Sequence, residues 1–289
     1  MHDVPLWSGG SFESPWTQRM EAAKRRGDDQ YWPIMRTVFA HDLSTLPLER
    51  FKVWSSVWNV PFVHSHIPQA YVWEYLRALR ESPHAEVYRR AVQEPLVGCT
   101  EGDLREHLAL FLSDNASATR VQHLAHLIVC GYTPDVLSKM NTIIELGSGI
   151  GEMPDIIYKL GFKGRYYIFD LPEILNIQAW YHRQLGHTHI VHTNDIQQLP
   201  IKSDLCIATW SFTEMPLPLR AQLMERIGRT CEWLIAYSRQ IFGLDNEAYL
   251  QEVFLPHVTT AQTQVQRIEM PFMPWDGGTQ YLTVRTSPI

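Results

Sequence analysis

The chain has 289 residues, of which 45% are hydrophobic, and it carries a formal net charge of −6. That hydrophobic content is ample for a folded core, whereas the net negative charge argues against a nucleic-acid partner, since the longest basic run is Lys24-Arg25-Arg26. No apolar stretch approaches the roughly eighteen residues that a membrane-spanning helix needs, so no membrane partner is expected.

The amino terminus and the cysteines both favour a cytoplasmic protein. A basic segment followed by an apolar run would mark a secretory signal, and the first residues do not show this pattern. The cysteines have no Cys-x-x-Cys spacing, so we expect reduced thiols in the core rather than disulfides. They are Cys99, Cys130, Cys206 and Cys231.

Residues 1–140 are predicted to form a helical segment in front of a domain that covers 141–289. Apolar residues at helical spacing predict helices over 44–57, 68–80, 86–92, 103–112 and 116–130. Tryptophans crowd into the start of this segment, and most of them are expected to pack between its helices. They are Trp7, Trp16, Trp32, Trp54, Trp58 and Trp73.

A glycine-rich turn follows, in the run Asn141-Thr-Ile-Ile-Glu-Leu-Gly-Ser-Gly-Ile-Gly151. The pattern predicts a strand over 142–146, a turn with three alternate glycines and a helix over 153–160. Glycine permits the tight turn and removes the Cβ atoms that would keep a ligand away from the backbone. Glu145 places a carboxylate before the first glycine, which suits a cationic or hydroxyl-rich ligand better than a pyrophosphate.

The next predicted strand, over 165–170, ends in an acid. Asp170 follows the last glycine by about the twenty residues expected of an acid that accepts hydrogen bonds from ribose hydroxyls. Because the carboxyl ends of adjacent parallel strands meet at one edge of a sheet, the turn and Asp170 should lie together. Alternatively, Asp170 could cap a helix that begins near Pro172, or the same side chain could both bind ribose and cap that helix.

The rest of the chain continues to alternate between strands and helices. Further strands are predicted over 189–195, 204–211 and 232–237, with helices over 173–185 and 216–229. A closing pair of strands is predicted over 265–270 and 280–285. This order predicts an α/β fold with a mostly parallel, Rossmann-like sheet that is covered on both faces by helices.

The pattern Glu-x-Gly-x-Gly-x-Gly resembles the first motif of class I S-adenosylmethionine-dependent methyltransferases, and the likeness extends over 141–286. It implies a seven-stranded sheet whose last strand is antiparallel, with S-adenosylmethionine as cofactor. It also implies that Asp195 and Ile196 flank the adenine and that Trp210 lies near the methyl group. Asp195 could instead be a turn former at the end of its strand. The remaining residues assigned to the cofactor are Glu145, Gly147, Ser148, Gly149, Gly151, Asp170 and Leu171.

A closer likeness is carried by Trp210-Ser-Phe-Thr-Glu-Met-Pro216, which resembles a Ser-Phe-Ser-Glu-Met segment of a sugar O-methyltransferase family, with Thr213 in place of the second serine. The helical segment over 118–132 resembles the same family. This likeness implies a sugar or glycan acceptor, with Ser211 near it. One or two of the amino-terminal tryptophans could then line the acceptor site. His123, or the cofacial His126, is a further candidate there, although a solvated helix face is the simpler interpretation.

A sugar hydroxyl is a weak nucleophile at neutral pH, so a base within hydrogen-bond reach would help its methylation. Glu214 follows the fourth predicted strand by a few residues and is the first candidate for this base. It could instead cap the helix that begins near Pro216. Arg239 and Asp245, after the fifth strand, are expected at the same edge, as a substrate-binding and a second catalytic candidate.

The same motifs bear on three other functions. A nicotinamide-dependent oxidoreductase would show Gly-x-Gly-x-x-Gly rather than Gly147-x-Gly149-x-Gly151, and the acid at Glu145 argues against it too. A methyltransferase for another small-molecule hydroxyl, or a non-catalytic cofactor-binding module, would fit the same motifs. No metal is expected, because His187 and His189 fall on the opposite strand face from His192 and no acid lies at metal-site spacing.

Overall fold

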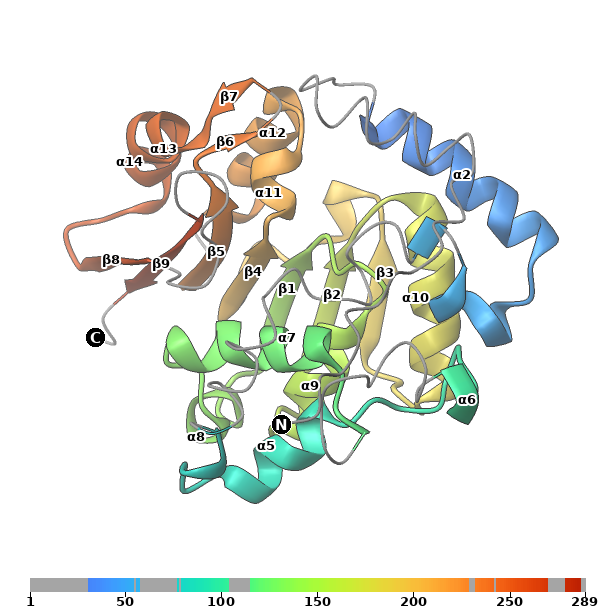
Figure 1. The fold of residues 1–289 in the computed structure, drawn as a ribbon. Helices are drawn as coiled ribbons and strands as arrows, with labels where there is room; N and C mark the ends of the chain where they lie inside the picture. Colours follow the sequence, from blue (N-terminus) through green and yellow to red (C-terminus); the bar gives the residue numbers. More distant parts are fainter. Residues whose placement is uncertain are drawn as a thin grey trace, which may run out of the picture.

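The computed structural model describes residues 31–54, 56–57, 77, 79–103, 115–228, 232–241, 243–269 and 279–286. These residues form a seven-stranded sheet in the order β3-β2-β1-β4-β5-β9-β8 (Figure 1). Most of the helix predicted over 68–80, and all but the start of the one predicted over 103–112, lie outside the described residues. So do Trp7, Trp16, Trp58, Trp73 and Cys231.

Five parallel strands and one antiparallel pair make up this sheet, as the sequence predicts. β9 lies between β5 and β8 and runs antiparallel to both. The strands are β1 (Thr142–Leu146), β2 (Arg165–Phe169), β3 (Ile190–Thr193), β4 (Leu205–Thr209), β5 (Glu232–Ser238), β8 (Thr263–Glu269) and β9 (Thr279–Thr286). The seven-stranded, mostly parallel α/β fold is therefore confirmed.

Helices cover both faces of the sheet, and β1 shows how the chain divides its side chains between them. Ile143 is fully buried in a core against α5 (Ala85–Val92), α7 (Ala118–Val129) and α9 (Glu152–Lys159). Ile144 points to the opposite face, because successive residues of a strand alternate. It lies in a second core, with side chains from α12 (Leu217–Ile227) and from 246–258.

The segment 246–258 contains α13 (Asn246–Tyr249), a π-helix η5 (Leu250–Phe254) and α14 (Leu255–Val258), none of which the sequence pattern predicted. It follows a small hairpin of β6 (Gln240–Ile241) and β7 (Leu244–Asp245). Apart from two amino-terminal helices, the other elements are α6 (Glu101–Asp103), α8 (Pro134–Leu137), α10 (Pro172–Gln184), η4 (Ile196–Gln198) and α11 (Ser211–Glu214).

The amino-terminal helices differ from the prediction. The expected helix over 44–57 is instead the end of α2 (Tyr31–Thr45) and a 3-10 helix, η1 (Leu48–Val53). Pro47 explains the break, because the residue before a proline is pushed away from helical angles. In Figure 1, α2 lies beside α10, and its Met35 and Phe39 share a third core with Ile150 of the glycine turn.

A fully buried ionic cluster also joins the amino-terminal segment to the sheet domain. Lys52 of η1 pairs with Glu94 and lies 3.6 Å from Glu152, the first residue of α9. Arg120 of α7 pairs with Asp155, one turn further along α9. Residues on both sides of the expected boundary near 140 therefore share cores and ion pairs.

The described cysteines, Cys99, Cys130 and Cys206, are buried and free. Core thiols were expected at these positions, and the structure confirms them. Within the described ranges, no helix is both long and apolar enough to cross a membrane.

Candidate functional site

The glycine turn between β1 and α9 is shaped by its glycines. Gly147, Gly149 and Gly151 all have positive φ, of 69°, 56° and 91°. A Cβ on Gly147 would lie 2.4 Å from the Cβ of Ser211, and one on Gly151 would lie 2.7 Å from Nε2 of His182. Both the backbone angles and the close neighbours therefore exclude a side chain here.

Asp170 closes this turn against the end of β2. Its Oδ2 accepts hydrogen bonds from the backbone N–H of Ser148 at 2.9 Å and from Nε2 of Gln178 at 2.7 Å, and its Oδ1 accepts from the N–H of Leu171 at 2.8 Å. Burial raises the pKa of Asp170 to about 6, although these bonds oppose the rise. The structure therefore brings Asp170, Ser148 and Leu171 together as the sequence predicts. The cap of α10 is Leu171, without a side-chain bond, so capping is not the role of Asp170.

Glu145 lies beneath the turn rather than beside an open ligand site. Its side chain is 1% exposed, and its Oε2 accepts from Ser148 Oγ at 2.6 Å and from the hydroxyl of Tyr166 at 2.9 Å. Burial raises the pKa of Glu145 to about 8, so the side chain is mainly protonated at pH 7. This corrects the expectation of a charged carboxylate there, because the alternation of β1 points Glu145 into the first core.

Glu145 should make folding stability depend on pH. From its ordinary pKa of 4.5 up to about 8, the folded chain holds a proton on Glu145 that the unfolded chain has lost, so stability should fall as the pH rises through this range. Glu145→Gln should remove this dependence. We expect the variant to melt at least about 2–4 °C above the wild type at pH 8 and close to it at pH 5, in thermal unfolding scans. A constant difference across pH would contradict the assignment.

The carboxyl end of β4 is strained at Trp210. This residue has φ 63° and ψ −33°, which are unusual angles for a large side chain. Its N–H still donates to the carbonyl of Ala236 on β5, at 2.7 Å. β4 ends at Thr209, two residues before the predicted Ser211, because the backbone turns at Trp210. Strain of this kind costs about 1–3 kcal/mol and clusters at functional sites.

Ser211 supports the turn instead of offering a free hydroxyl. Its Oγ donates to the carbonyl of Leu146, and its Cβ fills the space beside Gly147. Its described contacts join the ends of β1 and β4, and the substrate-binding role of Ser211 stays a prediction. Trp210 and Ser211 thus lie at the carboxyl edge, next to the glycine turn.

Glu214 ends α11, just past this edge, and is partly exposed. The alternative role as a helix cap is wrong, because α12 is capped by Pro216 without a side-chain hydrogen bond. Burial lowers the pKa of Arg220, and the negative charge of Glu214 opposes this effect. Arg220 in turn donates to the carbonyls of Met215 and Thr213, and so holds the loop that carries Glu214.

Arg239 directly precedes the small hairpin after β5, and Asp245 is the last residue of that hairpin. Both are exposed. Asp245 caps α13 by accepting from the N–H of Ala248 at 2.9 Å. The carbonyl of Arg239 accepts from the N–H of Asn246 at 2.8 Å. Asp245 therefore has a structural role, which sequence reasoning did not assign.

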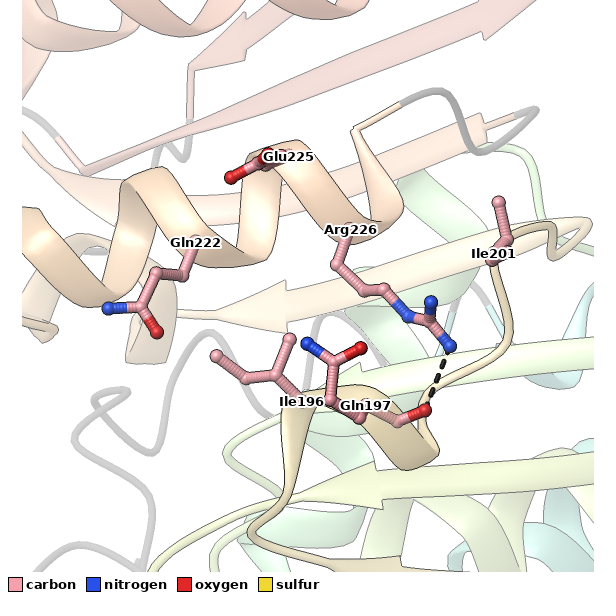
Figure 2. Close-up of a pocket in the computed structure, with 6 residues that line it drawn as sticks. All are labelled: Ile196, Gln197, Ile201, Gln222, Glu225 and Arg226. Carbon is pink, nitrogen blue, oxygen red and sulfur yellow. Dashed lines mark hydrogen bonds between the residues drawn. The ribbon is translucent and has the colours of Figure 1, made fainter.

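Asp195 and Ile196 follow β3. Asp195 is exposed and caps η4 by accepting from the N–H of Gln197 at 2.9 Å, so the turn-forming interpretation is confirmed. Ile196 packs on the second core. Figure 2 shows a surface pocket between η4 and α12 in which Arg226 donates to the carbonyl of Gln197 at 2.8 Å. The glycine turn contributes nothing to its lining, which consists of Ile196, Gln197, Ile201, Gln222, Glu225 and Arg226.

His123 and His126 are cofacial on α7, as predicted, with ring centroids 6.0 Å apart. They do not form a solvated helix face, because His126 is 1% exposed and His123 is partly buried. The ring of His126 lies 5.2 Å from that of Trp210, and its Nδ1 is hydrogen-bonded to the hydroxyl of Tyr281 on β9. The pair therefore lies against the strained end of β4.

Sequence reasoning missed His182 of α10, which supports the turn from the other side. Its Nε2 lies 2.7 Å from the carbonyl oxygen of Gly151, and its Nδ1 lies 2.8 Å from Nε2 of His192. Burial lowers the pKa of His182 to about 3, so the ring is neutral and donates its Nε2–H to Gly151. Among the described residues, no three His, Cys, Asp or Glu side chains are grouped to hold a metal ion.

No protein-family model matches the chain, and no curated protein matches it. Solved structures with a similar fold include an rRNA methylase from Streptococcus thermophilus, at 12% identity and a TM-score of 0.42, over 58% of this chain and 96% of that one. A mitomycin 7-O-methyltransferase matches at 12% identity and a TM-score of 0.43, over 96% of this chain and 74% of that one. A magnesium protoporphyrin IX methyltransferase from Synechocystis PCC 6803, with bound SAM, matches at 11% identity and a TM-score of 0.44, over 75% of this chain and 97% of that one. Likenesses this distant do not bear on activity.

Proposed function

We propose that this chain is an S-adenosylmethionine-dependent O-methyltransferase that acts on a hydroxyl of a sugar or glycan. The observation that carries the proposal is the glycine turn at the end of β1, whose Ser148 N–H donates to Asp170, the acid directly after β2. The strand order reverses between β1 and β4, and in open α/β sheets ligands bind at the carboxyl ends of the strands at such a point.

The residues at this edge fit the cofactor. The three glycines hold the turn in positive-φ conformations at this edge, and Asp170 Oδ1, with one hydrogen bond from Leu171, keeps capacity to accept from a ribose hydroxyl. Asp195 is exposed at the neighbouring strand end and would face the adenine. When bound, S-adenosylmethionine supplies a methyl group on a positively charged sulfur, which is already a strong electrophile.

The chain then has to hold the acceptor and remove its proton. Alignment of the acceptor oxygen with the methyl carbon is the larger part of this task. Glu214, four residues after Trp210 and past the end of β4, would accept the proton of the hydroxyl as it attacks. The sugar acceptor is supported by the Trp210–Pro216 segment, and another small-molecule hydroxyl is the runner-up.

A direct test is methyl transfer from radiolabelled S-adenosylmethionine to a panel of free sugars, nucleotide sugars and methyl glycosides, with purified full-length protein. We expect label in at least one sugar fraction, in an alkali-stable ether. Label in a non-sugar alcohol alone would move the function to the runner-up acceptor, and bound cofactor without transfer to any acceptor would favour a non-catalytic module.

Asp170→Ala should weaken the binding of S-adenosylhomocysteine, because ribose would lose a charged acceptor. One such hydrogen bond is worth about 1.5–3 kcal/mol, so the dissociation constant in calorimetry should rise roughly 10- to 150-fold. Asp204→Ala is the matched control: Asp204 accepts from the N–H groups of Asn141 and Thr142 at 2.6 and 2.9 Å, but at the opposite end of β1. Equal affinity in folded Asp170→Ala and wild type would refute the ribose role.

A further inference from the structure

His123 and His126 form a small polar cluster with Trp210 and Tyr281. The ring of His126 contacts those of Trp210 and Tyr281, with ring centroids 5.2 Å and 5.4 Å apart. His126 and Tyr281 are each 1% exposed, while His123 and Trp210 are partly exposed. The cluster is thus open to solvent at His123 and Trp210, and His126 is its buried end.

Two ring nitrogens of the cluster are buried without a hydrogen-bond partner among the described residues, Nε2 of His126 and Nδ1 of His123. Buried polar atoms are almost always paired in folded proteins, so two unpaired atoms in neighbouring rings indicate a missing partner. The hydroxyl of Tyr281 at Nδ1 of His126 sets which tautomer that ring adopts. When Nδ1–H donates to Tyr281, Nε2 presents a lone pair.

The missing partner should be uncharged. Burial lowers the pKa of His123 to about 4, and the nearby charge of Arg120 lowers it further. Burial, together with His123, also holds the pKa of His126 well below its usual value. Two neutral rings offer donors and acceptors but no net charge, which suits a hydroxyl better than a carboxylate or a phosphate.

We propose that His123 and His126 bind an uncharged hydroxyl of the acceptor, and that Tyr281 is a positioning residue for His126. A hydroxyl both donates and accepts, so it can pair with one ring that presents a lone pair and one that presents an N–H. The ring of Trp210 adds an apolar face for the carbon atoms beside that hydroxyl. The proposal rests on the proposed function, because Trp210 follows β4 at the edge assigned to the cofactor.

The test uses ethylene glycol as a minimal hydroxyl probe, titrated into the full chain with and without S-adenosylhomocysteine. Nitrogen-15 NMR of labelled histidine side chains reports the ring nitrogens, assigned by single His→Ala variants. We expect saturable shifts at Nε2 of His126 and Nδ1 of His123, and none with sodium formate. Tyr281→Phe should weaken the glycol response roughly fivefold, as for the loss of one neutral hydrogen bond. His189→Ala, at an exposed site before β3, should leave it unchanged.

Each outcome bears on one proposal. If neither nitrogen shows a saturable shift, as expected when an internal water is the only partner, the proposed hydroxyl subsite is wrong. An equal response to formate would also overturn it. An unchanged response in Tyr281→Phe overturns the positioning role. Failure of S-adenosylhomocysteine to bind contradicts the proposed function instead, and the glycol titration of the free chain still tests the subsite. If His126→Ala does not fold, His123→Ala removes one contact and should abolish saturation at His126.

Discussion

Glu214→Gln is expected to slow methyl transfer by about 10²–10⁴-fold, because a general base contributes a factor of this size. Glutamine keeps the shape of the side chain but cannot take the proton of the acceptor hydroxyl. Affinity for S-adenosylhomocysteine should hardly change, since the contact is to the acceptor. Single-turnover transfer measured across pH gives the rate, and the acidic limb of the wild-type profile should disappear in the variant.

Glu225→Gln is the matched control for this prediction. Glu225 lies on the next helix, α12, at the surface pocket of Figure 2, so its replacement should leave the rate unchanged. A structural role for Glu214, such as its interaction with Arg220, would lower thermal stability with turnover nearly intact. A variant with wild-type rate and wild-type pH profile would exclude Glu214 as the base.

Lys52→Met should lower the free energy of unfolding by about 3–5 kcal/mol, the usual result when one partner of a buried ion pair is removed. Lys52 is fully buried between Glu94 and Glu152. Burial alone would raise the pKa of Glu94, but the charges of Lys52 and Arg120 hold it below its usual value, so the variant would leave a buried anion. The neighbouring Glu152 supplies no positive charge to replace Lys52, and burial and the charge of Glu94 raise its pKa to about 8. Urea unfolding measures the loss.

Arg36→Met provides the control for Lys52→Met. Arg36 makes two hydrogen bonds of 3.0 Å to Glu173, but its side chain is 47% exposed, and such pairs contribute about 0–1 kcal/mol. A combined Lys52→Met/Glu94→Gln chain should recover part of the lost stability, since no unpaired charge remains. A loss for Lys52→Met as small as that for Arg36→Met would contradict the role of the buried cluster.

The strands of the sheet were predictable because each combines β-branched or aromatic residues with a clear stop signal. β1 begins and ends where the sequence predicts, and the aromatic strand ending at Asp170 differs by one residue. β4 was predicted too long, because apolar residues continue into Trp210 and only the backbone shows its positive φ. The segment 246–258 was not predicted, although its buried Leu250, Phe254 and Val258 lie four residues apart, as on one face of a helix.

The candidate site was predictable only where its residues lie close to a motif. The glycines and Asp170 follow strand ends, and topology brings these together. Lys52 and Tyr281 are distant in sequence from the glycine turn, and no local pattern marks a charge or hydroxyl that will be buried. For Ser211 the position at the sheet edge was predictable, but its hydrogen bond to the carbonyl of Leu146 cannot be seen in sequence.

The binding of cofactor at the glycine turn is tested by a calorimetric titration of the full chain with S-adenosylhomocysteine, repeated in the presence of excess NAD⁺. We expect saturable binding with one site per chain, no competition by the dinucleotide, and weaker binding in Asp170→Ala but not in Asp204→Ala. Absence of binding, or displacement by NAD⁺, would contradict the assignment of the glycine turn to S-adenosylmethionine.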